Sequence, residues 1–133
     1  MKLLLDTHIL LWWLGGDPRL PTHLHALIED RRHPVSVSVA SLWEMTIKAA
    51  IGKLELQDDL RTIEAILHCQ GITILPVQVQ HLEKLLELPQ HHRDPFDRLI
   101  IAQAIAEQMT VLSDDGEFPA YSVDLLLADA VLG

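Results

Sequence analysis

The chain begins MKLLLDTHILLWWL, residues 1–14, and this stretch decides the fold. Residues 2–5 end in a short, continuous apolar run of the kind that a fully buried parallel strand shows. The run from Thr7 to Leu14 is apolar enough for a following helix, which Gly15-Gly16-Asp17-Pro18 ends. Asp6 stands between strand and helix, where a carboxylate at the tip of a buried strand has no evident local use. The sequence therefore predicts a functional acid at this junction.

The rest of the chain alternates strands and helices in the same way. Alternating β-branched residues predict a strand at 35–39, and apolar runs predict strands at 72–75 and 110–112, with a weak edge strand near 121–123. Helices are expected at 23–32, 41–51, 60–69, 79–86 and 95–109. This order implies an α/β fold, in which helices cover both faces of a central, mostly parallel sheet of four to five strands.

Length and composition predict one compact domain over residues 1–133. With 49% hydrophobic residues, a chain of this length buries about two thirds of the surface that it exposes when unfolded. Cys69 is the only cysteine, which excludes an internal disulfide framework and favours a reducing, cytoplasmic location. Asp6 and His8 interrupt the first apolar run, so no signal peptide is expected. No apolar stretch approaches the ~20 residues that span a bilayer.

Net charge limits the classes of partner. Nineteen acids against ten lysines and arginines give −9 at pH 7, which on its own argues against a nonspecific binder of polyanions. Placement matters more than the sum. Four basic residues stand close to acids in the sequence: Lys48, Lys53, Arg93 and Arg98. Bound cations would also cancel part of a clustered negative charge, so a polyanionic ligand is not excluded.

Four acids stand where the chain is expected to turn from strand into helix: Asp6, Glu44, Asp97 and Asp115. In open parallel sheets the functional crevice lies beyond the carboxyl ends of the strands, and the helices that follow begin at the same rim. The four acids are therefore expected to converge. Carboxylates crowded in a low-dielectric cleft repel one another, and a hard divalent cation offsets this repulsion. The pattern predicts a magnesium or manganese site.

Two of the acids also have a structural interpretation. Glu44 lies three residues after Ser41, which is the spacing of a capping box, so it fits a helix cap as well as a metal ligand. Asp97 lies three residues after Asp94, with a proline between them, and an acid in the first turn of a helix gains from the helix dipole. Taken singly, neither acid decides between the two roles, and it is their joint occurrence that favours a site.

Four stretches in sequence order carry a resemblance: Leu4–His8, Ser41–Leu54, Asp94–Ala104 and Val111–Asp115. They resemble the successive motifs of a PIN domain, and above all those of the VapC-type ribonuclease toxins of bacterial toxin–antitoxin pairs. The resemblance covers essentially the whole chain. It implies a PIN-like three-layer α/β/α fold and a magnesium- or manganese-dependent endoribonuclease. It also implies a homodimer and inhibition by a cognate VapB-type antitoxin.

The resemblance assigns roles to single residues. Asp6 and Asp97 match the acids most directly associated with metal binding, Glu44 matches the second motif's acid, and Asp115 matches the fourth, with Asp114 as the adjacent alternative. Supporting positions are two hydroxyls beside acids and one helix cap: Thr7, Ser113 and Asp94. Candidates for contacts to the RNA backbone are Lys48, Lys53, Arg93 and Arg98. The implied products carry 5′-phosphate and 3′-hydroxyl ends, because an activated water attacks the phosphodiester.

Other functions fit less well. A haloacid-dehalogenase-like phosphatase needs a second acid two residues after the first, and that position is His8. A receiver-type signalling module needs a phosphorylatable aspartate at the end of its third strand, which here runs into Leu75-Pro76. A non-catalytic PIN-like binding module remains an alternative, and the intact acidic quartet counts against it. A zinc site lacks a cysteine pair and convincing histidine spacing.

The expected antitoxin groove rests on the apolar residues of the first two helices. Trp12 and Trp13 are adjacent, so they cannot both be buried on one helix face, which leaves one for a partner. The segments 7–14 and 24–28 are the predicted lining of the groove.

Overall fold

The computed structural model describes residues 1–89, 94–114 and 125–127. The predicted fourth acid, Asp115, the candidate Arg93 and the predicted edge strand at 121–123 lie outside these residues.

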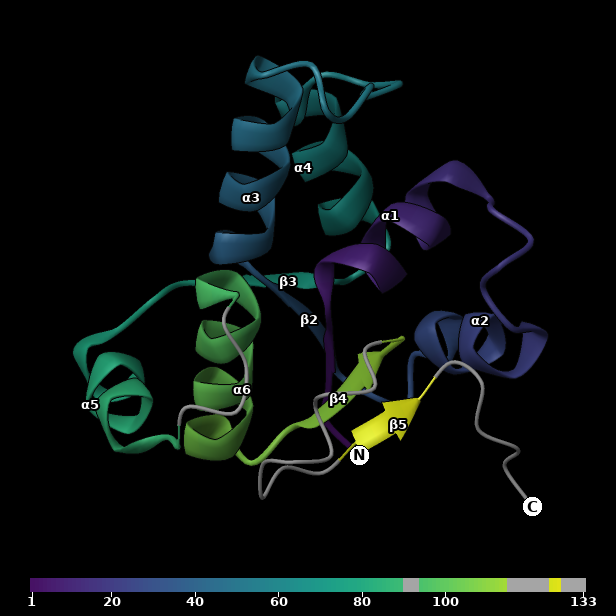
Figure 1. The fold of residues 1–133 in the computed structure, drawn as a ribbon. Coiled ribbons are helices and arrows are strands. Elements are labelled where there is room, and N and C mark those ends of the chain that lie inside the picture. The colour runs from purple at the N-terminus through teal and green to yellow at the C-terminus, as the bar shows by residue number, and fades with distance from the viewer. Residues whose placement is uncertain (90–93, 115–124, 128–133) are drawn as a thin grey trace.

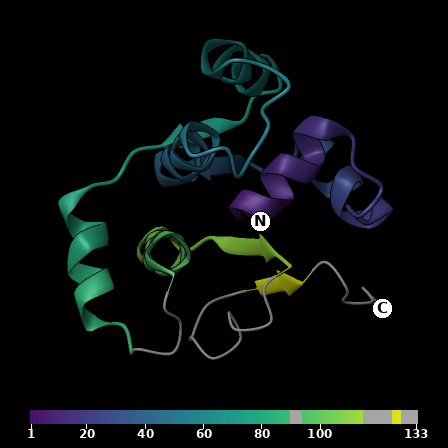
Figure 2. The same cartoon turned by 45° about the horizontal axis from the view of Figure 1, so that its top comes forward.

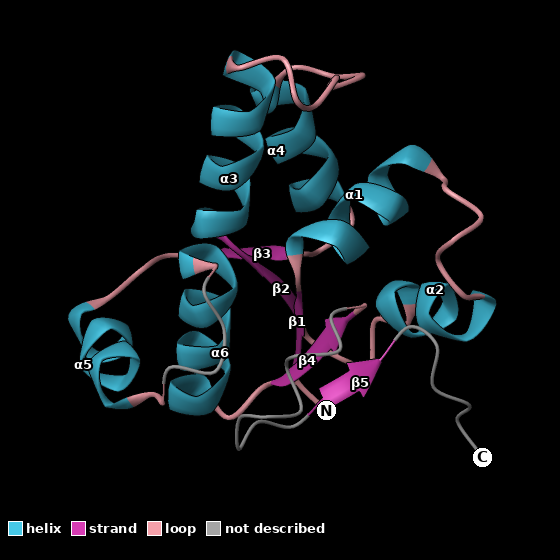
Figure 3. Cartoon of the chain, viewed as in Figure 1, coloured by secondary structure: helices cyan, strands magenta, loops and turns pink. Residues whose placement is uncertain are grey.

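Five strands form one sheet, in which every neighbouring pair is parallel. They are β1 (Leu3–Leu5), β2 (Val35–Ser38), β3 (Thr73–Leu75), β4 (Thr110–Ser113) and β5 (Leu125–Leu127). The strand order is β3-β2-β1-β4-β5, which places β1 at the centre (Figures 1 and 3). The predicted α/β fold with a parallel sheet is therefore confirmed, and β5 forms one edge of that sheet.

Helices cover both faces of this sheet. They are α1 (Thr7–Gly15), α2 (Thr22–Glu29), α3 (Val39–Ala50), α4 (Leu60–Cys69), α5 (Val79–Glu87) and α6 (Pro95–Glu107). Alternation along β1 separates two hydrophobic cores, because Leu3 and Leu5 pack with residues of α1 to α4 whereas Leu4 packs with residues of α6. Helix α5 lies alongside α6, away from the other helices (Figure 2).

Caps fix where the helices after β1, β2 and residue 94 begin. Asp6 caps α1 by accepting a hydrogen bond from the backbone N–H of Ile9, a local use that the sequence did not suggest. Asp94 caps α6 as predicted. Helix α3 begins at Val39 and is capped by Ser38, so the prediction that Ser41 opens this helix is wrong. Glu44 consequently lies beyond the first turn, and the capping box is not formed.

No helix in the described part of the chain is both long enough and apolar enough to span a membrane.

Candidate active site at the carboxyl edge of the sheet

The topological switch point of the sheet lies at the carboxyl end of its central strand, β1. From β1 the chain continues to β2 and β3 on one side, and later reaches β4 and β5 on the other. Crevices at such switch points are where open α/β sheets bind ligands. Asp6 directly follows β1 and Asp114 directly follows β4. The predicted convergence of acids at this edge therefore begins with these two residues.

Asp6 is held in place from two sides. Its side chain is 3% exposed, and it accepts a hydrogen bond from Ser113 Oγ at 2.5 Å and one from the backbone N–H of Ile9 at 2.8 Å. Burial raises the pKa of the Asp6 carboxyl to about 6; the two hydrogen bonds oppose this shift, and nearby Asp114 adds to it. In the described part of the chain, no lysine or arginine forms an ion pair with Asp6.

Glu44 is buried in the second turn of α3 and is bonded through both carboxylate oxygens. Thr7 Oγ1 hydrogen bonds to Glu44 Oε1 at 2.7 Å, and Lys48 Nζ lies 2.7 Å from Glu44 Oε2. Thr7 Oγ1 also lies 3.0 Å from Ser41 Oγ, which is likewise buried. Because Thr7 follows Asp6 in the chain, this hydroxyl connects the acid of β1 to the acid of α3.

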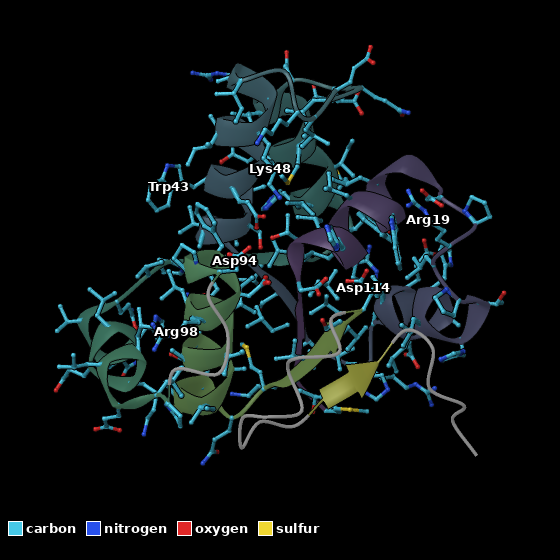
Figure 4. The ribbon with its side chains drawn as sticks, in the orientation of Figure 1. Arg19, Trp43, Lys48, Asp94, Arg98 and Asp114 are labelled. Atoms are coloured by element: carbon cyan, nitrogen blue, oxygen red, sulfur yellow. The ribbon has the colours of Figure 1, made fainter. Side chains whose placement is uncertain are left out.

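The start of α6 adds two further acids near this network, Asp94 and Asp97. Asp94 Oδ1 accepts hydrogen bonds from the backbone N–H groups of Phe96 at 2.8 Å and Asp97 at 3.3 Å. The carboxylates of Glu44, Asp94 and Asp97 all raise the pKa of Lys48, with Glu44 the largest cause and partial burial opposing it. Figure 4 shows Asp94 at the start of α6, close to the start of α3, and Lys48 farther along α3, in its last turn.

The aromatic contact between these helices involves the most exposed tryptophan. The Trp43 ring meets the Phe96 ring edge-on at 5.1 Å between centroids, and Trp43 remains 60% exposed. Trp12 and Trp13 are instead both partly buried against the larger core. Within the segment 24–28, Leu24 and Ile28 are buried in that core, so these two side chains do not line a surface groove.

The described acids do not form a complete metal site. Among the described residues, no three His, Cys, Asp or Glu side chains stand together as a group that could hold a metal ion. The acids lie instead in two parts: Asp6 with Asp114, and Glu44 with the start of α6. Asp115, the predicted fourth ligand, falls outside the described residues.

The predicted RNA contacts are scattered. Lys48 lies within the acid edge, whereas Lys53 is exposed just beyond the far end of α3. Arg98 donates a hydrogen bond through Nη2 to the carbonyl oxygen of Leu88 at 3.4 Å, and its side chain lies toward α5 (Figure 4). Arg93 falls outside the described residues.

A pocket of about 590 Å³ lies beside the acid edge, between α1 and the loop at 54–58. His8 Nδ1 lies 3.1 Å from Asp114 Oδ1, and both residues line the pocket. The His8 and Trp12 rings stack at 6.4 Å between centroids, and the Arg19 guanidinium lies 5.3 Å from the Trp12 ring centroid. The sequence gave no signal for Arg19, whose contact with Trp12 depends on the turn after α1.

The fold and the site together describe an α/β protein with a parallel sheet and buried acids at its central switch point. The chain matches the PIN domain family over residues 3–124, and it therefore belongs to that family. This confirms the expectation that four short motifs raised.

Solved structures of the same fold come from bacterial toxin–antitoxin complexes. VapBC2 from Rickettsia felis, bound to a DNA fragment from its promoter, superposes with a TM-score of 0.73 at 18% identity, covering 96% of this chain and 98% of that one. VapBC-1 from nontypeable Haemophilus influenzae gives 0.68 at 17% identity, with 98% and 100% coverage. FitAcB from Neisseria gonorrhoeae gives 0.64 at 20% identity, with 95% and 97% coverage.

A curated relative of a different kind covers only part of the chain. Inosine-5′-monophosphate dehydrogenase from Streptococcus pyogenes is 33% identical over 89 residues, which is 59% of this chain. The match spans 17% of the dehydrogenase, so that enzyme's activity is not carried over.

Proposed function

We propose that this PIN domain is a VapC-type toxin that hydrolyses RNA phosphodiester bonds with the help of Mg²⁺ or Mn²⁺. The observation that carries the proposal is the pair of buried acids at the switch point, each oriented by a hydroxyl: Asp6 by Ser113 and Glu44 by Thr7. Buried carboxylates are costly, and sites that orient them for chemistry are the usual reason for keeping them.

The donor set fits a hard divalent cation in its chemistry. The available ligands are carboxylate oxygens, with no cysteine and no histidine pair among them, which favours Mg²⁺ or Mn²⁺ over zinc. Burial raises the pKa of Asp6 to about 6, so its charge is destabilised in the metal-free protein and a cation would restore the balance. Asp6 and Asp97 would be the principal ligands, with Glu44 and Asp115 completing the set.

The residues of the chain would each have a defined task. A bound divalent cation supplies an activated water and positive charge for the scissile phosphate. Ser113 and Thr7 hold the carboxylates of Asp6 and Glu44 in one orientation, because each hydroxyl hydrogen bonds to a single carboxylate oxygen. Asp94 fixes the first turn of α6 and hence the position of Asp97. Products with 5′-phosphate and 3′-hydroxyl ends are expected.

Contacts to the RNA backbone are proposed for basic residues at or near this edge: Lys48, Lys53, Arg93 and Arg98. Of these, Lys48 has the strongest support, because it lies beside Glu44 and near the start of α6. Arg98 has the weakest, because it bonds to the carbonyl of Leu88 in the direction of α5.

Partners are proposed from the same relationship. The similar structures include VapBC and FitAB complexes, some bound to DNA, and they support a VapB-type antitoxin that inhibits this chain. A homodimer and a cytoplasmic location belong to the same proposal. The receiver-type alternative is disfavoured, because receivers have the strand order 2-1-3-4-5 whereas this sheet has the order 3-2-1-4-5.

The proposal is tested by cleavage of total cellular RNA with purified protein, with Mg²⁺ and with a chelator. Cleavage is expected only with the metal. Asp6→Asn, Asp97→Asn and Glu44→Gln are each expected to reduce cleavage by at least about 100-fold, since even residues that only orient ligands cost 10–100-fold. Asp30→Asn changes a partly exposed acid ahead of β2 that pairs with Arg32; it is the control and is expected to cleave normally. Folded variants that cleave like the wild type would end the proposal.

A further inference from the structure

Lys48 occupies an unusual place for a helix lysine. It lies one turn after Glu44 on α3, and its Nζ atom is 2.7 Å from Glu44 Oε2. The Glu44 side chain is 6% exposed, whereas the Lys48 side chain is 41% exposed. The ammonium group of a half-exposed side chain thus contacts a carboxylate that is almost entirely buried.

The charge of the same ammonium group is also influenced by acids of a second helix. The carboxylates of Asp94 and Asp97 at the start of α6 act on Lys48 in addition to Glu44. The positive charge of Lys48, held at Glu44, therefore also acts on the acids at the start of α6 and offsets part of their repulsion with Glu44. A lysine that only stabilised its own helix would need no second helix for this.

Glu44 has no oxygen left without a partner. Thr7 bonds to Oε1 and Lys48 to Oε2. A divalent cation that used Glu44 would come close to the ammonium group, and the two positive charges would repel each other strongly in this partly buried place.

We propose that Lys48 is a built-in counter-ion that neutralises Glu44 in the metal-free protein and withdraws from it when a divalent cation binds. The inference rests on the proposed function and adds a competitor to its metal site. Lys48 can withdraw because its long, flexible stem is half exposed and its charge is well hydrated in solvent. The released ammonium group then lies beside the site, where an RNA phosphate would meet it.

The chain offers a matched control for the bland explanation. Lys84 pairs with Glu87 on α5 at 3.1 Å, and both side chains are substantially exposed. This pair is an ordinary surface ion pair on a helix that packs against α6 away from the acid edge. If Lys48 acted only as such a pair, its removal and the removal of Lys84 would have the same effect on metal binding, namely none.

The test is Mn²⁺ binding to the full chain by titration calorimetry, without RNA. Lys48→Met is expected to bind Mn²⁺ about fivefold or more tightly than the wild type, which is the lower end of typical coupling between two sites. Lys84→Met is expected to bind like the wild type. Lys48→Arg keeps the charge and is expected to retain the wild-type dissociation constant, and it separates loss of charge from loss of the side chain if Lys48→Met does not fold.

A double-mutant cycle locates the effect. In a Glu44→Gln background, adding Lys48→Met is expected to leave the dissociation constant unchanged, because the competition acts through Glu44. Unchanged or weaker binding by folded Lys48→Met, or tighter binding by Lys48→Arg, overturns the inference alone. A wild type that binds no Mn²⁺ overturns the proposed function, and the inference falls with it.

Discussion

Ser113 Oγ donates a hydrogen bond to Asp6 Oδ2 at 2.5 Å, across the junction of β1 and β4, although 107 positions separate the two residues. The bond joins the ends of the neighbouring strands β1 and β4 at the switch point, where Asp6 lies. A strand from the second half of the chain thus orients the acid that ends the first strand.

Removal of the Ser113 hydroxyl should change the pKa of Asp6 as well as the orientation of its carboxylate. Ser113→Ala deletes a hydrogen bond that lowers the pKa of Asp6, so the pKa is expected to rise above about 6. The acidic limb of the pH profile for RNA cleavage should then move to higher pH, and the rate should fall by about 10–100-fold. Cleavage measured across the pH range checks both effects, and a profile that keeps its wild-type position would contradict this role.

Burial of Asp6 should appear in the pH dependence of stability. Its pKa is raised from 3.8 to about 6, so the folded chain holds the proton more tightly than the unfolded chain does. The free energy of unfolding contributed by Asp6 therefore falls as pH rises through this window, by about 3 kcal/mol for a shift of about two units, and stays low above it.

Denaturant unfolding in a chelator checks this effect. Asp6→Asn lacks the ionisation but keeps an oxygen that can accept from Ile9, so it is the matched reference. The wild type is expected to lose stability relative to this variant between about pH 4 and pH 7. Parallel stability curves for the two proteins would show that the carboxylate is not destabilised by burial.

The central strand of the sheet and the cap at the start of α6 could both be predicted from the sequence. The run Leu3–Leu5 identified the central strand, because a buried strand in a parallel sheet is apolar on both faces. Asp94 was identifiable as a cap from the proline that follows it. Both features are local, and the residues that define them are neighbours in the chain.

What the sequence could not supply depends on contacts between distant elements. Ser38 and Ser41 both suit a helix cap, and the choice follows from β2 ending at Ser38, which pairs with Leu75 of β3. The Thr7–Glu44 bond spans 37 positions and depends on how α1 and α3 pack. The bond from Arg98 to the carbonyl oxygen of Leu88 likewise depends on the rotation of α6, which the sequence does not indicate.

The Thr7 hydroxyl is expected to matter for activity more than for folding. Thr7→Val keeps the shape but leaves Glu44 Oε1 without its 2.7 Å hydrogen bond, so cleavage should fall by about 10–100-fold. Thr7→Ser keeps the hydroxyl and should retain most of the activity. Rates on one RNA oligonucleotide, with circular dichroism to confirm folding, check the pair. Equal rates for the two variants would remove Thr7 from the site.

The start of α3 can be tested through its cap. Ser38 Oγ accepts a hydrogen bond from the backbone N–H of Ala40 at 3.0 Å, so Ser38→Ala should lower the free energy of unfolding by about 1 kcal/mol. Ser41 makes no such cap, because its hydroxyl lies 3.0 Å from Thr7 Oγ1. Ser41→Ala should therefore affect cleavage more than Ser38→Ala does. A larger loss of stability for Ser41→Ala than for Ser38→Ala would instead place the cap at Ser41.

Substitutions at the contact between α5 and α6 should change the stability of the fold but not RNA cleavage. His81 is fully buried; its Nδ1 accepts from the backbone N–H of Gln78 at 3.0 Å, so its Nε2 carries the proton and donates to Glu107 Oε1 at 2.9 Å. Glu107→Ala leaves that buried N–H unpaired and should cost about 1–3 kcal/mol. Glu107→Gln retains an acceptor and should cost less. Denaturant unfolding measures the difference, and equal stability of the two variants would mean that His81 finds another partner.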